Sequence, residues 1–341
     1  MSMNPSALFK KIRSVRAVLL GDLCLDVYWS ADMTKSKLSR ETAHYPLPIV
    51  KERMSPGAGG NAASCMAALC PKALTVLGVI GKDWRGAELQ EEFSKIPGLD
   101  ASRIVVSGAV RTNAYCKPMR FGYSGEETED PRLDFENYEP LPKDAEEALL
   151  AALSASVSGA DVLVVSDQFD FGCVTGAVRD RVNAFASDGL RVLVDSRSRI
   201  GHYRNALLKP NEIECARALG LSEGALSEGA SEADLFAAAA ALSKATASDV
   251  CLTLGRRGSL FYGEKSVRIP AVSQKPPVDI VGAGDCFLSA LALALAAGAA
   301  EEEACSLASY ASAVSVKKLG VTGTASPEEI RALWEERHAD H

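Results

Sequence analysis

The chain has 341 residues, 47% of them hydrophobic, which is enough for one large domain with at most a small appendage. Its formal net charge is −7 and its basic residues form no block, which argues against a nucleic-acid-binding protein. Residues 1–15 lack an apolar signal core, and the most apolar run, 287–300, is too short to span a bilayer. We therefore expect a cytoplasmic protein without nucleic-acid or membrane partners, in which the nine scattered cysteines are reduced.

Short apolar runs that are typical of buried strands recur along the chain. They occur at 16–21, 161–166, 190–195, 206–209 and 249–254. Helical patterns lie between the later runs, at 143–156, 173–187, 212–219 and 231–246. This alternation predicts an α/β fold with a mostly parallel sheet covered by helices on both faces. Ligands of such sheets bind beyond the carboxyl ends of the strands.

The stretch from residue 23 to about residue 135 has a different pattern. Strand-like segments without intervening helices predict a small sheet that forms a lid over the main body, at 46–50, 104–106, 112–121 and 132–135. Two helical patterns, 60–70 and 84–95, should belong to the body. We expect a single domain over 1–341, with lid segments within about 23–56 and 103–136. The polar segments 122–131 and 222–232 are predicted to be exposed loops.

Two polar motifs lie in the first part of the chain. Asp22 and Asp26 follow the first predicted strand, where carboxylates can accept hydrogen bonds from sugar hydroxyls, although aspartates that form turns are equally compatible. Gly57 to Asn61 precede a helix, so the backbone could approach a ligand closely there. A capping Asn61 after a flexible turn explains the same residues.

Two further motifs follow later strands. Lys209 and Asn211 precede a predicted helix, and the spacing of three places Glu214 near Asn211, where the pair could organise Mg²⁺ and nucleotide phosphates. The same spacing is typical of a capping box, and both roles are compatible. The segment 253–258, with Gly255 and Gly258, should turn sharply and offer its backbone to a nucleotide, as an ordinary hairpin turn also would.

The most informative motif is Asp279-Ile-Val-Gly-Ala-Gly-Asp285, which runs into an apolar helical stretch. The amides of Gly282, Ala283 and Gly284 can converge on an anion at the positive end of this helix. Asp285 lies in the first turn, where its carboxylate could take a proton from a hydroxyl beside that anion. A capping role for Asp285 is the structural alternative. The motif favours phosphoryl transfer to an alcohol, with Asp285 as the base.

These motifs, in this order, resemble those of the ribokinase-like (PfkB) carbohydrate kinases over roughly residues 15–330. The resemblance implies a three-layer α/β/α sandwich with a small β-sheet lid, and ATP and Mg²⁺ as cofactors. It assigns the catalytic base to Asp285 and the anion hole to 282–284, and metal and phosphate binding to Asn211 and Glu214. The nucleotide would lie along 253–258, from Thr253 to Gly258, and the sugar would be held by Asp22, Asp26, Gly59, Gly60 and Asn61.

Within that family, segments 21–29, 132–136 and 318–327 look like the kinase domain of bifunctional heptose-7-phosphate kinase/ADP-heptose synthases. Ile280 and Ser309 depart from the common pattern, which usually has Thr and Asn there. Because the chain ends at residue 341, we expect no nucleotidyltransferase half. The family also implies a potassium site near Asp279.

Several cations on or near the lid could bind the phosphate of a phosphorylated sugar, namely Arg111, Lys117, Arg132 and Arg197. Convergence of two or more of them would favour a sugar phosphate, and otherwise a free sugar or nucleoside fits better. We expect an ATP-dependent sugar kinase that forms a homodimer through the lid. The alternatives are a catalytically silent, sugar-responsive regulatory protein and a nucleoside kinase of the same fold.

Overall fold

The computed structural model describes residues 3–339. The strands of its main sheet are β1 (Arg16–Gly21), β4 (Ala73–Leu77), β6 (Leu99–Asp100), β11 (Val162–Asp167), β12 (Val192–Ser196), β13 (Leu207–Leu208), β14 (Asp249–Thr253), β15 (Ser259–Tyr262) and β16 (Val267–Ile269). In this part of the chain they form a nine-stranded sheet in the order β16-β15-β14-β13-β12-β11-β1-β4-β6. The strands from β6 to β14 pair in parallel, and β15 and β16 add an antiparallel edge.

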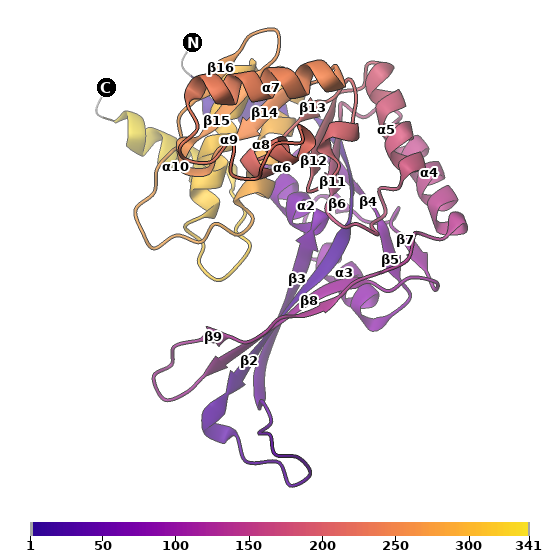
Figure 1. Cartoon of the computed structure of the whole chain (residues 1–341), viewed down its shortest axis with the longest axis vertical. Coiled ribbons are helices and arrows are strands. Elements are labelled where there is room, and N and C mark those ends of the chain that lie inside the picture. Colours follow the sequence, from indigo (N-terminus) through magenta and orange to yellow (C-terminus); the bar gives the residue numbers. More distant parts are fainter. Residues whose placement is uncertain (1–2, 340–341) are drawn as a thin grey trace.

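Helices cover both faces of this sheet (Figure 1). They are α1 (Pro5–Ile12), α2 (Gly59–Ala68), α3 (Trp84–Ser94), α4 (Lys143–Val157), α5 (Gly176–Ser187), α6 (Glu212–Ala218), α7 (Glu232–Thr246), α8 (Ala283–Ala296), α9 (Glu301–Ser315) and α10 (Pro327–His338). Side chains alternate along β1, so that Leu19 packs in one apolar core with α1, α2, α8 and α9, and Leu20 packs in a second core with α4, α5 and α7. The predicted three-layer α/β/α sandwich is confirmed.

The lid is a separate sheet that projects from the body (Figure 1). It contains β2 (Leu23–Asp32), β3 (Ile49–Ala58), β8 (Asn113–Phe121), β9 (Thr128–Glu129) and β10 (Leu133–Phe135). The strand order is β10-β8-β2-β3, and β9 pairs with β8. Strand β2 follows β1 almost directly, so the chain passes from the body to the centre of the lid at Asp22.

The structure adds strand β4 to the predicted main sheet and removes one segment from the predicted lid. Residues 104–106 are not part of it, because β7 (Val105–Ser107) pairs in parallel with β5 (Val79–Gly81) in a small sheet of its own. The main-sheet strand β4 was not predicted. Residues 23–32 and 49–58 lie within the predicted lid segment 23–56 and form the two longest lid strands, β2 and β3.

The strand predicted at 46–50 is instead β3 at 49–58, and the remaining predicted strands and helices occur within a few residues of their expected bounds. Eight of the nine cysteine side chains are buried and none of the nine forms a disulfide bond, as expected for reduced thiols packed in a core. Within residues 3–339, no helix has both the length and the apolar character needed to cross a membrane.

Candidate active site

The predicted catalytic loop opens helix α8 as expected. Gly282 has a left-handed conformation (φ 78°, ψ 0°) and is the N-cap, so Asp285 lies in the first helical turn. A Cβ atom at position 282 would lie 2.4 Å from Thr322 Cγ2, which explains why glycine is needed there. The first helical bond runs from the Cys286 amide to the Gly282 carbonyl over 3.0 Å.

The amides of this turn differ in their availability. The Ala283 amide donates to the Ile280 carbonyl over 3.2 Å, so it is engaged within the turn. Among the described residues, the amides of Gly284 and Asp285 have no backbone or side-chain acceptor, as is usual for the first turn of a helix. The Gly282 amide likewise has no acceptor among the described residues, so Gly282 and Gly284 keep free amides in the predicted anion hole at 282–284, and the Asp285 amide extends it.

Asp285 is half-buried, and its surroundings bring the pKa of its carboxyl group close to neutral pH. Burial, and next the charges of Asp195 and Asp26, raise the pKa of Asp285 to about 7, while Lys209 acts in the opposite direction. A carboxyl group with this pKa can take up and release a proton at neutral pH. The same influences place Asp285 among groups from the body and from the lid.

The end of the neighbouring strands supplies a buried ion pair. Lys209 follows β13 and Asp195 is the penultimate residue of β12, with 3.3 Å between Lys209 Nζ and Asp195 Oδ2. The charges of Glu214 and Asp285 also act on Lys209 and help to keep its pKa above the usual value despite burial. Lys209 was expected near the nucleotide phosphates, and it does lie beside Asp285. Asp195 was not predicted as a site residue, although it ends a predicted strand.

Asn211 and Glu214 form the capping box of helix α6. Asn211 Oδ1 accepts from the amides of Ile213 and Glu214, both over 2.9 Å, and Glu214 Oε2 accepts from the Asn211 amide over 2.8 Å. The capping alternative is thus present. Burial and the charge of Asp195 raise the pKa of Glu214 to about 7, with Lys209 opposing them.

The donor set for a metal is small. Within residues 3–339 no group of three or more His, Cys, Asp or Glu side chains is arranged to hold a metal ion. Glu214 Oε1 makes no hydrogen bond in this part of the chain, so one carboxylate oxygen is available. One or two carboxylate oxygens suffice for Mg²⁺ when phosphate oxygens and water supply its other ligands, so these residues fit that ion.

The segment 253–258 forms the predicted sharp turn between β14 and β15. The Thr253 amide donates to the Pro210 carbonyl over 2.9 Å, which joins this turn to the start of α6. Gly258 has φ 86°, and a Cβ atom there would lie 2.2 Å from the Ile269 carbonyl oxygen. Gly255 has φ 53° and open space around it. The turn therefore brings its backbone close to the Asn211 motif, and the Arg257 side chain lies 3.6 Å from Glu212 Oε1 at the start of α6.

Charged and aromatic side chains of the lid gather around Asp26. Lys117 Nζ lies 3.8 Å from Asp26 Oδ1 and donates to the Tyr28 hydroxyl over 2.9 Å. Burial raises the pKa of Asp26, and the charges of Lys117, Arg132 and Arg53 oppose that rise. Since Asp26 also acts on Asp285, this lid cluster (Asp26, Tyr28, Arg53, Lys117 and Arg132) adjoins the base.

Two of the predicted cations meet at Tyr115. The guanidinium of Arg132 lies 4.1 Å from the centre of the Tyr115 ring and forms two hydrogen bonds to Asp134. The positive charge of Arg197 acts on both Tyr115 and Glu214. The charge of Arg197 is therefore felt both at the lid and at the helix α6 motif. Tyr115 and Arg53 were missed by the sequence analysis, because only the strand pairing of the lid brings them here.

The Asp22 side chain is buried and bonded to the backbone rather than open to a ligand. It is 2% exposed, and its carboxylate accepts from the amides of Gln168, Phe169 and Cys173 over 2.7–2.8 Å. These bonds fix the loop after β11. The contacts give no support to the expected sugar-binding role of Asp22, and they leave Asp26 as the carboxylate that faces the other charged groups of the lid.

Gly59 and Gly60 begin helix α2 beside this aspartate. The Gly59 amide donates to the Asp22 carbonyl over 2.8 Å, and a Cβ atom on Gly59 would approach the same oxygen to 2.9 Å. A Cβ atom on Gly60 would lie 2.6 Å from Pro56 Cβ. Both glycines are thus required for close packing. Asn61 follows them in the first turn of α2 and is not the cap, since the helix begins at Gly59.

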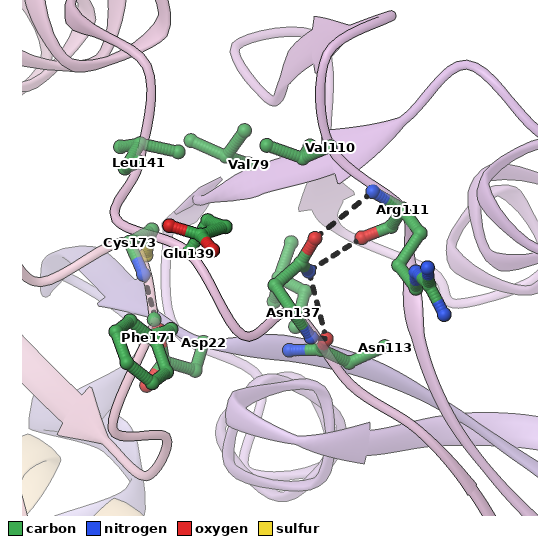
Figure 2. Close-up of a pocket in the computed structure, with 12 residues that line it drawn as sticks. Asp22, Val79, Val110, Arg111, Asn113, Asn137, Glu139, Leu141, Phe171 and Cys173 are labelled. Atoms are coloured by element: carbon green, nitrogen blue, oxygen red, sulfur yellow. Dashed lines mark hydrogen bonds between the residues drawn. The ribbon is translucent and has the colours of Figure 1, made fainter.

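Arg111 lies apart from the lid cluster. It lines a small pocket with Asp22, Asn113 and Asn137 (Figure 2). Its amide donates to Asn137 Oδ1 over 3.1 Å, and its carbonyl accepts from Asn137 Nδ2 over 2.8 Å. In Figure 2 the guanidinium extends away from Asn137. These contacts give no support to the expected role of Arg111 in binding a substrate phosphate.

The model of the pfkB family of carbohydrate kinases matches residues 38–329, and the chain belongs to this family. Curated relatives include the bifunctional protein HldE of Bradyrhizobium sp. (strain ORS 278), 32% identical over 92% of this chain, and HldE of Caulobacter sp. (strain K31), 36% identical over 95%. The match covers 62% and 63% of those proteins, so the chain spans less than two thirds of their length.

Solved structures agree on the fold. Ribokinase of Arabidopsis thaliana, complexed with ribose and ATP, superposes with a TM-score of 0.68 at 19% identity, covering 94% of this chain and 98% of that one. Phosphofructokinase-2 of Escherichia coli, in complex with substrates and products, gives a TM-score of 0.72 at 22% identity, covering 94% and 99%. The ribokinase-like fold expected from the sequence is confirmed.

Proposed function

We propose that the chain is an ATP-dependent kinase whose acceptor is a sugar that already carries a phosphate group. Asp285 takes the proton of an acceptor hydroxyl, the oxygen attacks the γ-phosphorus, and the bond from phosphorus to the ADP oxygen breaks. The products are ADP, the newly phosphorylated sugar and a proton. The position of Asp285 carries this proposal, because a carboxyl group with a pKa of about 7 opens helix α8 between the strand ends and the lid.

The anion hole stabilises the moving phosphoryl group. The amides of Gly284 and Asp285 and the positive end of α8 oppose the charge that develops on its oxygens. Lys209 adds a positive charge beside Asp285. Glu214 would hold Mg²⁺, with Asn211 fixing the turn, and the ion would offset phosphate charge. The backbone of 253–258 supports the nucleotide.

The lid cations favour a phosphorylated acceptor. Lys117, Arg132 and Arg53 all act on Asp26, and the charge of Arg197 acts on Tyr115, whose ring lies under the Arg132 guanidinium. Arg132 also pairs with Asp134, and a cluster of arginines is well suited to a phosphate group. Asp26 is then available to accept hydrogen bonds from sugar hydroxyls, together with Asn61.

Three further parts of the proposal concern the surroundings of the enzyme. We expect it to act in the cytoplasm. Exposed apolar side chains on the lid, including Ile49, Val50 and Leu133, support a homodimer formed through the lid. Light scattering at micromolar concentration would contradict the dimer by giving the monomer mass. A potassium ion near Asp279 is expected from the family, and activity in potassium compared with an organic cation tests it.

The decisive experiment measures ADP release from Mg·ATP over a matched panel of free and phosphorylated sugars. We expect turnover with a phosphorylated sugar, its loss in Asp285→Asn with binding retained, and a raised KM in Arg132→Gln but not in the control Arg111→Gln. Near-normal turnover of Asp285→Asn would remove the proposed base. Binding without ADP release would favour a silent regulatory protein, and preference for nucleosides would favour the nucleoside kinase.

A further inference from the structure

Arg53 joins the lid to the body beside the proposed cleft. It lies on β3, and its Nη2 donates to the Gly320 carbonyl over 2.8 Å, in the segment between α9 and α10. Its guanidinium carbon lies 3.8 Å from the centre of the Tyr28 ring, on the residue paired with it across β2 and β3. An arginine held between an aromatic face and a carbonyl has little freedom left.

On the body side, further hydrogen bonds connect Gly320 with the anion hole. The Gly320 amide donates to Asp279 Oδ2 over 3.1 Å, and Asp279 Oδ1 accepts from the Val281 amide over 3.0 Å. Val281 precedes Gly282, the N-cap of α8. Thr322, two residues after Gly320, packs against Gly282. The loop that Arg53 contacts is therefore part of the support of the catalytic turn.

On the lid side, Arg53 is connected with the proposed acceptor site. The Arg53 guanidinium lies over the ring of Tyr28. The Tyr28 hydroxyl accepts a hydrogen bond from Lys117, and Lys117 approaches Asp26. The charge of Arg53 also acts on Asp26. One side chain thus contacts both the sheet that would hold the sugar and the loop that supports the anion hole.

We propose that Arg53 is a positioning residue that latches the lid to the loop at 316–322 and so couples acceptor binding to the arrangement of the catalytic turn. Its effect on turnover rests on the proposed kinase function. With the latch intact, the closed lid limits the access of water to the γ-phosphoryl group. Without it, ATP and water react more often to give ADP and inorganic phosphate, with the proton released to solvent.

A direct contact between Arg53 and the phosphate of the acceptor is the competing role, and it has different consequences. It would weaken binding of phosphorylated acceptors alone and leave the unliganded lid unchanged. A latch affects every acceptor and alters the lid before any ligand binds. The two roles are separable because the bond to Gly320 joins the lid to the body and involves no group of the acceptor.

The test compares Arg53→Met, Arg53→Lys and the control Lys51→Met, which removes an exposed positive charge from the same strand. Hydrogen exchange of unliganded protein should rise about three- to ten-fold at 316–322 in Arg53→Met, the range expected for loss of one hydrogen bond, and stay unchanged in the control. Arg53→Lys, which lacks the planar group, should recover only part of the protection. In turnover, ADP released per phosphorylated sugar should rise in Arg53→Met.

Unchanged exchange at 316–322 in Arg53→Met would overturn the latch, even if KM for phosphorylated sugars rises. An unchanged ratio of ADP to phosphorylated sugar would overturn the proposal that the latch limits the reaction of ATP with water. If the wild-type protein phosphorylates no sugar, the kinase proposal fails, while the exchange experiment still decides whether the latch exists. Global unfolding of Arg53→Met would appear as increased exchange in the central strand β1, and Arg53→Lys then carries the comparison.

Discussion

Lys209 and Asp195 form a buried ion pair, with 3.3 Å between Nζ and Oδ2, at the carboxyl ends of two neighbouring strands. Lys209 is 4% exposed and Asp195 is 8% exposed. Their opposite charges act on Asp285 in opposite directions, since Asp195 raises its pKa and Lys209 lowers it. Burial raises the pKa of the proposed base most, and this pair, which does not need to touch the substrate, adjusts it further.

The first prediction concerns Asp195→Asn. Removing the negative charge at position 195 and freeing Lys209 from its partner should both lower the pKa of Asp285 from about 7. Activity falls when Asp285 is protonated, so the acid limb of kcat/KM should shift to lower pH. A pH profile with a saturating nucleotide measures this. Asp180→Asn, an exposed change on α5, is the control, and an unchanged or raised limb would contradict the assignment.

The second prediction is that Asp285→Asn increases stability while it removes turnover. The folded-state pKa lies above the usual value of 3.8, so the folded protein retains this proton at a pH where the unfolded chain has lost it. The free energy of unfolding of the wild type should therefore fall from about pH 4 to about pH 7 because of this group. Because asparagine does not ionise, the variant should not lose this stability as the pH rises. Thermal unfolding should show a gain at pH 8 and almost none at pH 4, and an equal gain at both would exclude the ionisation as its cause.

The third prediction separates the two aspartates of the first motif. Asp22→Asn should lower the free energy of unfolding by about 3 kcal/mol, because one amide oxygen cannot replace the carboxylate that accepts from three buried amides. Asp26→Asn should have a much smaller effect on stability and instead raise the acceptor KM. Urea unfolding and steady-state kinetics on both variants test this, and similar effects of the two changes would refute the division of roles.

The sequence sufficed for the features that depend on local pattern. The strand and helix alternation after residue 143 predicted the parallel sheet, since each element carries its own periodicity. The start of α8 was also predictable, because small residues followed by an acidic residue and an apolar run indicate the beginning of a helix. The capping box of Asn211 and Glu214 was foreseen as one of two compatible roles.

Features that depend on pairing between distant segments were not predictable. Arg53 acquires its contacts only because β3 pairs with β2 and the loop at 316–322 lies beside it. Asp22 and Asp26 look alike in sequence, yet one accepts from the loop after β11 and the other faces the lid cations. The segment 104–106 has a strand pattern, but its partner β5 decides that it lies outside the lid. In each case the distinguishing contact lies many residues away.

The last prediction concerns Ala58, which has φ 49° and ψ −123° immediately before α2. This region is populated almost only by glycine, so alanine stores strain there. Ala58→Gly should raise the free energy of unfolding by about 1 kcal/mol, because the relief of strain exceeds the added freedom of the unfolded chain. Ala151→Gly, at an exposed position within α4, should instead lower it by about 1 kcal/mol. Urea titration of both variants measures the difference. If both changes destabilise the protein to the same extent, the turn before α2 is unstrained, and the close approach of Gly59 to Asp22 needs another explanation.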